Sequence, residues 1–435
     1  MEKSEKILRR LEMLHPKKID LSLNRLRVLL TKLENPHLKL PPTIHIAGTN
    51  GKGSVTSFLR NIFENAKFKV HCYTSPHLIR FNERIRINSK LISNGYLNEL
   101  LEECEFHNNG EEITFFEITT AAAFLAFSRI KSDLLILETG LGGRFDATNI
   151  INEKLCSVIT PISMDHMNFL GSKLELIAKE KLGILNNCKK IILSKQKTSV
   201  RKIARNITKK KKIKLFEEGI NWKVINTNVS ERNFLMSYEN KEFKFQLPSL
   251  MGDHQIENAS TAIATILSLN EFNISNKTIN QSLIKTVWPA RMQNLKKGKL
   301  SKIIGEEFDI WLDGGHNLDA SNIIAKTISQ WKEKKIVLII GMIYGKDPIN
   351  FLKKIISKIS LLIILPIDNH QYVMPYKIKN DVKERFRPRF DIECCLNIEE
   401  ALKITKNKII SGKILVCGSL YLAGEVLKAD GYKIK

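Results

Sequence analysis

Residues 45–54 read His-Ile-Ala-Gly-Thr-Asn-Gly-Lys-Gly-Ser, an apolar stretch that ends in a glycine-rich turn with one lysine and a closing hydroxyl. Glycines let backbone N–H groups approach anionic oxygens, and a following helix offers its positive N-terminus. The lysine adds a point charge, and the hydroxyl can face Mg²⁺. The pattern predicts a loop that binds nucleotide phosphates. Its candidate binding residues are Gly48, Thr49, Asn50, Gly51, Lys52, Gly53 and Ser54.

This phosphate loop is irregular. The common pattern has a glycine five residues before its Gly-Lys pair and Ser or Thr directly after the pair, whereas this chain has Ile46 and Gly53 at those positions. The departure separates the loop from those of GTPases and kinases. Taken alone, the segment could also be an ordinary strand-to-helix turn.

A second glycine-rich turn, residues 139–149, follows directly on an apolar stretch that ends at Glu138. Ligand sites in open α/β sheets lie beyond the carboxyl ends of the strands. Glu138, Arg144 and Asp146 therefore stand where chemistry would occur. A plain turn with solvated charges is the alternative for this motif by itself.

Two further candidates follow along the chain. His166 comes after the strand-like residues 157–160 and could contact Mg²⁺ or phosphate, although a histidine at a strand end more often has a structural role. Lys181, fifteen residues later, reads by itself as an ordinary surface lysine on an amphipathic helix.

The last third of the chain has a similar arrangement. An apolar stretch ends in Asp313-Gly314-Gly315-His316, in which the carboxylate could hold a ribose hydroxyl and the imidazole a phosphate. A tight turn before a helix is an equally good interpretation. Arg291 lies beside the break at Trp288-Pro289, where an arginine could bind phosphates when two domains close.

The apolar pattern predicts the scaffold that must position these residues. Strand-like and helical stretches alternate, which is typical of an α/β fold with a mostly parallel sheet and helices on both faces. The short alternating segments in residues 221–247 predict a few short antiparallel strands. We expect a P-loop ATPase-type domain at 1–287 and a smaller Rossmann-like α/β domain at 288–435. The predicted strands are 43–47, 69–73, 133–138, 157–160, 190–194, 309–312, 336–340, 361–365 and 414–416, and the predicted helices include 4–15, 54–66, 320–331 and 348–356.

Composition limits the classes of function. The chain has 435 residues, 43% of them hydrophobic, and its apolar runs are far shorter than a membrane span, so we expect a cytoplasmic protein without membrane contact. Seven cysteines without CxxC spacing indicate reduced thiols rather than a zinc site or disulfides. The net charge of +24 raises the hypothesis of nucleic-acid binding. We expect none, because the lysines are dispersed and the one run, Lys209–Lys212, reads as solvated surface. The charge would still attract anionic small molecules.

Taken together and in this order, these segments resemble the folylpolyglutamate synthase and dihydrofolate synthase family of the Mur ligase superfamily, over nearly the whole chain. Each segment alone is weak or moderate support, but ten in register are strong. The segments are His45–Ser54, Tyr73–Leu78 with Phe81–Ile85, Phe115–Glu117, Glu138–Asn149, Asp165–His166, Glu180–Ile184, His254–Ala259, Trp288–Arg291, Asp313–Asn317 and Gly418–Tyr421.

The resemblance implies roles at the nucleotide end of a site. Thr49–Lys52 would hold ATP phosphates, and Ser75, Glu138 and His166 match ligands of Mg²⁺, of which we expect two ions. Lys181 matches a lysine that family members carry as a carbamate, a change that turns a cation into an anion able to approach the metal. The positions that match contacts to adenine, phosphates and ribose are Asn258, Arg291, Asp313 and His316, and the expected catalytic set is Lys52, His166, Lys181, Arg291 and His316.

The resemblance also implies a pterin pocket against the first domain. An aromatic wall with a carboxylate suits a flat ring that bears N–H donors. The residues that align with pterin-contacting stretches are Ile19, Asp20, Leu21, Thr114, Phe115, Phe116, Glu117, Phe145, Asp146 and Ala147.

The implied reaction is ATP-dependent amide formation. A substrate carboxylate attacks the γ-phosphate of ATP, and the amine of L-glutamate opens the resulting acyl phosphate to an amide and phosphate. The acceptor would be dihydropteroate, a reduced folate or both, and we expect a monomer. One alternative is another Mur-type ligase acting on a UDP-linked muropeptide, which Phe115–Glu117 and Ser75–Leu78 disfavour. A second is a P-loop nucleotide switch, which would hydrolyse nucleotide without glutamate.

Overall fold

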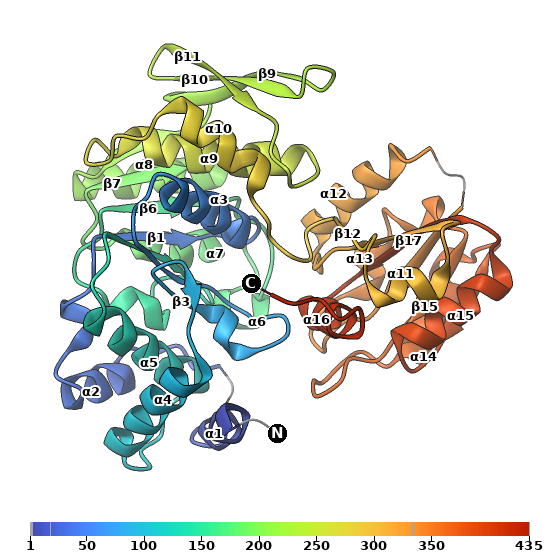
Figure 1. The fold of residues 1–435 in the computed structure, drawn as a ribbon, viewed down its shortest axis with the longest axis horizontal. Coiled ribbons are helices and arrows are strands. Elements are labelled where there is room, and N and C mark those ends of the chain that lie inside the picture. The colour runs from blue at the N-terminus through green and yellow to red at the C-terminus, as the bar shows by residue number, and fades with distance from the viewer. Residues whose placement is uncertain (1–2, 18, 333–334, 435) are drawn as a thin grey trace.

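The computed structural model describes residues 3–17, 19–332 and 335–434. It has the predicted α/β architecture. Figure 1 shows two bodies, each built around a sheet, with the C-terminal end of the chain between them. No helix among the described residues is long and apolar enough to cross a membrane. All seven cysteines lie in the described part of the chain and are free.

The larger sheet has eight strands in the order β4-β3-β2-β5-β1-β6-β7-β8. All neighbouring strands from β2 to β8 run parallel, and β3 and β4 form an antiparallel edge. The strands are β1 (Thr43–Ala47), β2 (Val70–Tyr73), β3 (Ile85–Ile87), β4 (Lys90–Leu91), β5 (Leu134–Glu138), β6 (Cys156–Ile159), β7 (Lys190–Leu193) and β8 (Lys214–Glu217).

The register of this sheet gathers the predicted site. Ile46 of β1 pairs with Glu138 of β5, and Ala47 pairs with Ile159 of β6. Tyr73 of β2 pairs with Leu137 of β5. Four parallel strands thus end at one edge, so the loops that follow them emerge side by side.

Side chains alternate between the two faces of the sheet. Ile44 and Ile46 belong to the core that includes the apolar face of α3, whereas Leu135 and Leu137 belong to the core with α4 and α5. Figure 1 shows these helices on opposite sides of the sheet. The helices of this part are α1 (Lys3–Glu12), α2 (Asn24–Lys32), α3 (Lys52–Asn65), α4 (Asn94–Asn108), α5 (Phe115–Arg129), α6 (Met167–Leu170), α7 (Leu174–Lys181), α8 (Thr198–Lys211), α9 (Asp253–Ser268) and α10 (Asn276–Lys285).

The segment expected to be antiparallel forms a three-stranded sheet. It consists of β9 (Trp222–Asn228), β10 (Asn233–Tyr238) and β11 (Lys241–Gln246), in the order β11-β10-β9. It lies at the outer end of the larger body, beyond α9 and α10 (Figure 1). The lysine run Lys209–Lys212 is exposed at the end of α8.

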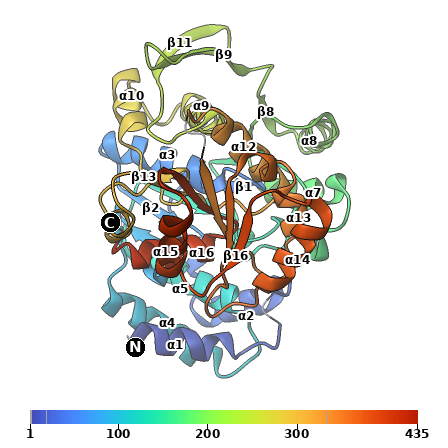
Figure 2. The same ribbon diagram turned by 90° about the vertical axis from the view of Figure 1, so that its right-hand side faces the viewer.

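The second large sheet has six strands in the order β12-β13-β17-β14-β15-β16, and β12 alone is antiparallel to its neighbour. Helices cover both of its faces, as Figure 2 shows. The segment from Thr286 to Met292 connects α10 to this sheet, and the domain boundary near residue 287 stays a prediction. The elements are β12 (Gln293–Asn294), α11 (Lys299–Ile304), β13 (Phe308–Leu312), α12 (Leu318–Ser329), β14 (Ile336–Ile340), α13 (Pro348–Leu352), β15 (Leu361–Ile364), α14 (Pro375–Phe386), β16 (Asp391–Cys394), α15 (Ile398–Lys408), β17 (Gly412–Cys417) and α16 (Leu420–Ala429).

Candidate active site

The phosphate loop connects β1 to α3, which begins at Lys52, two residues earlier than predicted. The backbone N–H groups of Thr49 and Asn50 donate to the carbonyl of Pro161, at 3.0 and 3.2 Å, and so attach the loop to the segment after β6. The first-turn amides of α3 have no partners within the helix. These amides point towards the loop and form the positive end of the helix dipole. Such an arrangement can bind an anion.

The irregular glycine of this loop has a structural reason. A Cβ atom on Gly53 would lie 2.8 Å from Nε1 of Trp288 and 2.9 Å from its Cζ2, so the indole packs where a serine or threonine side chain would otherwise stand. The next residue, Ser54, is buried, and its hydroxyl has no hydrogen-bond partner among the described residues. The hydroxyl that usually follows the Gly-Lys pair is thus found one residue later, at Ser54. Its usual position, Gly53, leaves space for Trp288 of the segment that leads into the second sheet.

Glu138 ends β5 and is a buried carboxylate with unused bonding capacity. It is 4% exposed, and its Oε2 has no hydrogen-bond partner in the described part of the chain. Burial raises the pKa of Glu138 to about 7, against the opposing effects of Lys52, Arg291 and a hydrogen bond from the backbone of Ser75. A buried carboxylate oxygen without a partner can accept a metal ion, so Glu138 and the neighbouring Ser75 fit a Mg²⁺ ion. No group of three or more His, Cys, Asp or Glu side chains among the described residues could hold a metal by itself. Phosphate oxygens and water would complete such a site.

Lys181 is buried, so its interpretation as a surface lysine is wrong. Its residue is 4% exposed, and Nζ donates to the carbonyl of Gly48 at 2.9 Å. The cause is the second glycine-rich turn, which packs against the end of α7: a Cβ on Gly143 would lie 2.7 Å from the carbonyl oxygens of both Glu180 and Lys181. Burial, together with the charge of Lys52, lowers the pKa of Lys181 to about 7. A large share of this amine is therefore neutral and nucleophilic near neutral pH.

A buried lysine that the motifs did not indicate supports the same region. Lys154 is 4% exposed, and its Nζ donates to Oδ1 of Asn149 at 2.8 Å and to the carbonyls of Ile184 and Asn186 at 2.8 and 2.9 Å. Asn149 in turn donates to the carbonyl of Gly183 at 3.3 Å. Lys154 thus joins the glycine-rich turn to the residues just after Lys181, and nothing in the local sequence distinguishes it from an exposed lysine.

Asp165 is the centre of a cluster that joins the two sheets. Its Oδ1 lies 2.5 Å from Nζ of Lys346, which follows β14, and its Oδ2 lies 3.7 Å from Nε2 of His316. Asn317 donates to Asp165 at 3.3 Å and to Oδ1 of Asn50 in the phosphate loop at 2.9 Å. Burial would raise the pKa of Asp165, but the nearby His316, His166 and Lys346 side chains hold it well below its usual range. The carboxylate therefore stays ionised. The sequence motifs included Asp165 and Asn317 but assigned them no role, and Lys346 was missed.

The structure brings His166 to the same cluster but leaves it less enclosed. Its Nε2 lies 3.9 Å from Oδ2 of Asp165, and its side chain is 39% exposed. His166 has a backbone φ of 50°, in the left-handed region, directly before α6. An exposed imidazole at a strained turn beside the phosphate loop fits a group that contacts a ligand better than a structural histidine.

The residues expected to contact nucleotide in the second sheet are partly engaged already. The two oxygens of Asp313 accept hydrogen bonds from the backbone N–H groups of Gly315 at 2.7 Å and Met292 at 2.9 Å. This fastens Arg291 beside the turn, where its Nη1 donates to the carbonyl of Ala290 at 2.8 Å. The ring Nδ1 of His316 lies 2.9 Å from the carbonyl of Gly314, which leaves Nε2 facing Asp165. Asn258 in α9 is 5% exposed and lies next to Gly51 of the phosphate loop.

The predicted pterin segments also come together. Arg25 donates to Asp20 at 3.0 Å and to Glu117 at 3.2 Å, and so links Ile19–Leu21 to Thr114–Glu117. Oε2 of Glu117 caps α5 through the backbone and hydroxyl of Thr114, whereas its buried Oε1 has no partner in the described residues. That free oxygen could accept from a ring N–H.

The third pterin segment, Phe145–Ala147, divides into different environments. Phe145 is 42% exposed and Ala147 is buried. The carboxylate of Asp146 is 2% exposed and accepts from the backbone of Leu141 at 2.7 Å and of Thr148 at 3.0 Å, so its visible role is to close the glycine-rich turn. The ring of Phe116 packs on this turn, where a Cβ on Gly140 would lie 2.5 Å from it.

Comparisons with known proteins find similarity over most of the chain. The model of the Mur ligase middle domain matches residues 46–266, and that of the C-terminal domain of dihydrofolate synthetase matches residues 296–429. The dihydrofolate synthase/folylpolyglutamate synthase of Bacillus subtilis is 33% identical over 346 residues, which are 77% of this chain and 78% of the relative. The structure of E. coli FolC in complex with DHPP and ADP has a TM-score of 0.86 at 26% identity, covering 98% of this chain and 97% of that one. For the Yersinia pestis bifunctional folylpolyglutamate synthase/dihydrofolate synthase complexed with AMPPNP and Mn ion, these values are 0.83, 25%, 98% and 97%.

Proposed function

The chain belongs to the dihydrofolate synthase and folylpolyglutamate synthase family of Mur ligases, and we propose that it uses ATP to add L-glutamate to dihydropteroate, to reduced folates or to both. One observation carries the proposal. The phosphate loop, the carboxylate of Glu138 with its partnerless Oε2, and the buried amine of Lys181 meet at one edge of the parallel sheet, opposite Arg291 and His316.

ATP and a divalent cation are the expected ligands. The E. coli relative was solved with ADP and the Yersinia pestis relative with AMPPNP and Mn ion. In this chain the first-turn amides of α3 and Lys52 would bind the phosphates. Two Mg²⁺ ions would be held by Ser75, Glu138, His166 and a carbamylated Lys181. When bound, Mg²⁺ would neutralise charge on phosphate oxygens and act as a Lewis acid.

The buried state of Lys181 supports the carbamate. A neutral amine attacks CO₂, a new N–C bond forms, and one proton is released, so the side chain becomes an anion. The pKa of about 7 leaves much of the amine in the form that this step needs. The positive charge of Lys52 disfavours the protonated form of Lys181 but would stabilise a negatively charged carbamate at the same place.

In the reaction, a carboxylate oxygen of the acceptor attacks the γ-phosphorus of ATP, and the bond to the β-phosphate oxygen breaks to release ADP. The amine of L-glutamate then attacks the acyl carbon, phosphate leaves with the bonding electrons, and the amine loses a proton. Negative charge moves among phosphate oxygens in both steps. The main role of Lys52 and Arg291 would therefore be to stabilise this charge electrostatically. Closure of the cleft through Asp165 and Lys346 would exclude water, which otherwise hydrolyses the acyl phosphate.

The segments around Glu117 favour dihydropteroate as one acceptor. Glu117 has a partnerless buried carboxylate oxygen, and the ring of Phe116 packs on Gly140 of the glycine-rich turn. An aromatic ring and a free carboxylate oxygen suit a flat ligand with N–H donors. Cytoplasmic location and a monomeric state stay predictions from the sequence.

The proposal is tested with purified protein, ATP, Mg²⁺ and L-glutamate, offered dihydropteroate or tetrahydrofolate, with the products identified by mass. Lys52→Ala should abolish glutamate-dependent ADP formation, whereas Lys179→Ala, at an exposed lysine of α7, should retain it. Near-normal turnover by Lys52→Ala would refute the assignment. ATP hydrolysis that ignores glutamate would support a nucleotide switch instead.

The carbamate has its own test. Lys181→Ala should lose activity and regain part of it when short-chain carboxylic acids are added, because a free carboxylate can occupy the vacated space. Full activity of Lys181→Ala without any added acid would show that no carbamate is needed.

A further inference from the structure

The loop that carries Ser75 packs against the cores of both bodies. Leu78 and Ile79 pack against the core of the second body, whereas Phe81 and Ile85, a few residues later, belong to the core of the first body with α4 and α5. We call residues 74–84 the bridging loop. A candidate metal ligand thus lies on a segment whose position depends on both bodies.

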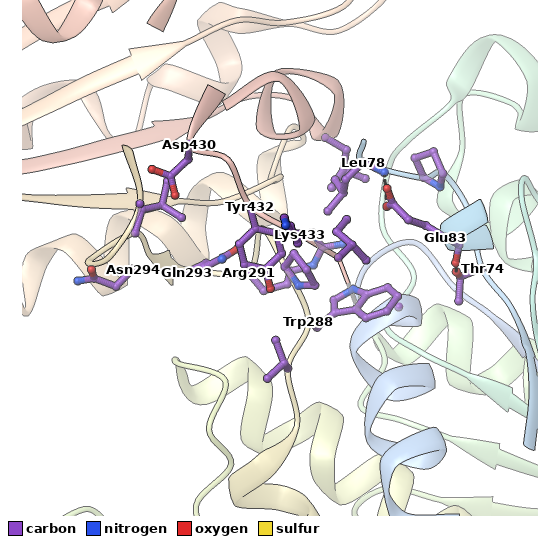
Figure 3. A pocket seen from close by; sticks show the side chains of 18 of the residues that line it. Thr74, Leu78, Glu83, Trp288, Arg291, Gln293, Asn294, Asp430, Tyr432 and Lys433 are labelled. Atoms are coloured by element: carbon purple, nitrogen blue, oxygen red, sulfur yellow. Dashed lines mark hydrogen bonds between the residues drawn. The ribbon is translucent and has the colours of Figure 1, made fainter. Parts of the chain in front are cut away.

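A single carboxylate fixes the shape of the bridging loop. Glu83 accepts hydrogen bonds from the backbone N–H groups of Leu78, Ile79 and Arg80, each at 2.7 Å. Figure 3 shows its side chain directed at the backbone of Leu78, on the wall of a cavity of about 920 Å³ that is lined by both bodies. Three successive peptide groups are therefore held around one side chain.

Two further bonds hold the part of the bridging loop around Ser75. The backbone N–H of Thr74 donates to the carbonyl of Arg84 at 2.9 Å, and Nε of Arg84 donates to Nδ1 of His77 at 2.9 Å. Ser75 lies between these two points of attachment. We therefore expect the loop to move as a unit, so that a displacement of Leu78 is passed on to Ser75.

Helix α16 of the second body meets the bridging loop at Gly424. A Cβ atom on Gly424 would lie 2.0 Å from the carbonyl oxygen of Leu78 and 2.8 Å from its carbonyl carbon. Glycine within a helix costs about 1 kcal/mol relative to alanine. Here the glycine lets the helix approach the loop backbone more closely than any other residue would allow. Figure 1 shows α16 on the side of the second body that faces the larger one.

The same face of α16 contacts the turn that is expected to bind nucleotide. A Cβ on Gly314 would lie 2.2 Å from Cδ2 of Leu420 and 3.0 Å from Nη1 of Arg291. Leu420 precedes Gly424 by four residues, and residues with this spacing lie on the same side of a helix. One face of α16 therefore connects the Asp313–His316 turn to the bridging loop.

We infer that α16 positions Ser75 for the metal ion, with Gly424 and Glu83 as the positioning residues. The inference rests on the proposed function, in which Ser75 and Glu138 hold Mg²⁺. This ion demands near-ideal octahedral geometry with short bonds, so a displaced serine hydroxyl binds it poorly. The metal site on the first sheet is therefore complete only when the second body is in place.

Plain packing between the bodies is the competing explanation. If the contact of Gly424 with Leu78 only holds the bodies together, its loss would loosen the cleft and weaken nucleotide binding with or without a metal ion. If the contact positions Ser75, its loss would weaken binding only when the metal ion is present, and only while Ser75 is there to be positioned.

The experiment measures by calorimetry how much Mn²⁺ tightens the binding of AMPPNP to the full-length protein, as the ratio of the Kd without metal to the Kd at saturating Mn²⁺. Contacts of a Cβ are rarely shorter than 3.0 Å, so in Gly424→Ala the contact of 2.0 Å must open by about 1 Å. The ratio should fall roughly tenfold, with the metal-free Kd unchanged. In a Ser75→Ala background the same substitution should change the ratio less than about twofold, because the ligand that it displaces is already absent.

Glu83→Gln tests the same loop without touching α16, and it keeps the test open if Gly424→Ala does not fold. One oxygen becomes an amino group, which cannot accept from a backbone N–H, so the ratio should again fall, but not in the Ser75→Ala background. An effect of the lost charge alone would persist in that background. Gly95→Ala, where a Cβ meets no atom within 4 Å, is the matched control and should keep the wild-type ratio.

The outcomes separate the inference from the proposed function. Equal losses in the two backgrounds, or wild-type ratios in folded Gly424→Ala and Glu83→Gln, would overturn the inference, while tightening of AMPPNP binding by Mn²⁺ in the wild type upholds the proposed metal site. Equal weakening with and without Mn²⁺ would also overturn the inference. If Mn²⁺ does not tighten AMPPNP binding to the wild type, the proposed metal site fails and the inference fails with it.

Discussion

Replacing Lys154 with Met should destabilise the protein, although the residue contacts no predicted ligand. The substitution keeps much of the apolar volume and removes the charged donor shared by Asn149, Ile184 and Asn186. Asn149 and Ile184 are buried, and each of their oxygens left without its donor costs about 1 kcal/mol or more, whereas the carbonyl of the exposed Asn186 can accept from water. The two buried oxygens, less the relief of no longer burying an ammonium group, give an expected loss of about 1–3 kcal/mol in the free energy of unfolding.

The pH dependence of this loss has a definite sign. Burial lowers the pKa of Lys154 from 10.5 to about 8. Between these two values the unfolded chain binds more protons at this residue than the folded protein, so the contribution of Lys154 to stability rises with pH, by about 3 kcal/mol over the whole window. Below pH 8 the group is charged in both states, and its contribution is constant.

The assay is urea unfolding followed by tryptophan fluorescence and circular dichroism at pH 7.0, 8.5 and 9.5. Lys189→Met, at a nearby exposed lysine, is the control and should stay within about 0.5 kcal/mol of the wild type. Subtracting the Lys154→Met data from the wild type removes the titration of all other groups. A difference below about 0.5 kcal/mol at pH 7, or one that does not grow with pH, would refute the reasoning.

The same variant should affect catalysis through Lys181. Loss of the tie between the glycine-rich turn and residues 184–186 loosens the end of α7, so kcat should fall more than the KM for ATP rises. Unchanged kcat in a destabilised protein would show that Lys154 supports the fold but not the position of Lys181.

Gly53→Ala places a Cβ 2.8 Å from the indole of Trp288, so it should shift the tryptophan emission and lower kcat/KM by roughly tenfold. Gly95→Ala, where a Cβ meets no atom within 4 Å, is its control, and equal behaviour of the two variants would contradict the packing argument. Lys346→Met removes the cation that lies 2.5 Å from Asp165 and should favour an open cleft, measured as a larger radius of gyration by small-angle scattering. An unchanged radius would mean that the contact does not hold the two bodies together.

The parts of the fold that follow from local pattern could be predicted from the sequence. The strands at 43–47 and 336–340 are continuous apolar runs because both of their faces are covered, and the structure has strands with those bounds. The phosphate loop was recognisable because its glycines and lysine are adjacent in the chain. The edge strands β3 and β4 gave no such signal, since they are short and partly exposed.

The environment of single side chains could not be predicted in this way. Lys154 and Lys181 have the same residue type as many exposed lysines. The turn at Gly143 packs against Lys181, and the carbonyls of Ile184 and Asn186 bind Lys154, so the burial of each depends on a distant part of the sequence. The resemblance to a family indicated Lys181, but it offered nothing for Lys154. Burial by non-local packing has no counterpart in periodicity or composition.

Asp165 contacts groups from both sheets. These contacts explain why the site is difficult to find from the sequence, and also how a bound ligand could change the contact between the two sheets. Asp165 and Lys346 are far apart in the chain, and neither belongs to a pattern that predicts the other. Asn317 bonds both to Asp165 and to Asn50, so closure of the cleft and the shape of the phosphate loop depend on the same side chains. A nucleotide bound to the loop would lie next to this cluster and would change the local charge that holds Lys346 and His316 in place. Binding on one sheet would therefore alter the attraction between the two, which is the physical coupling that a ligase needs if it is to exclude water only when its substrates are present.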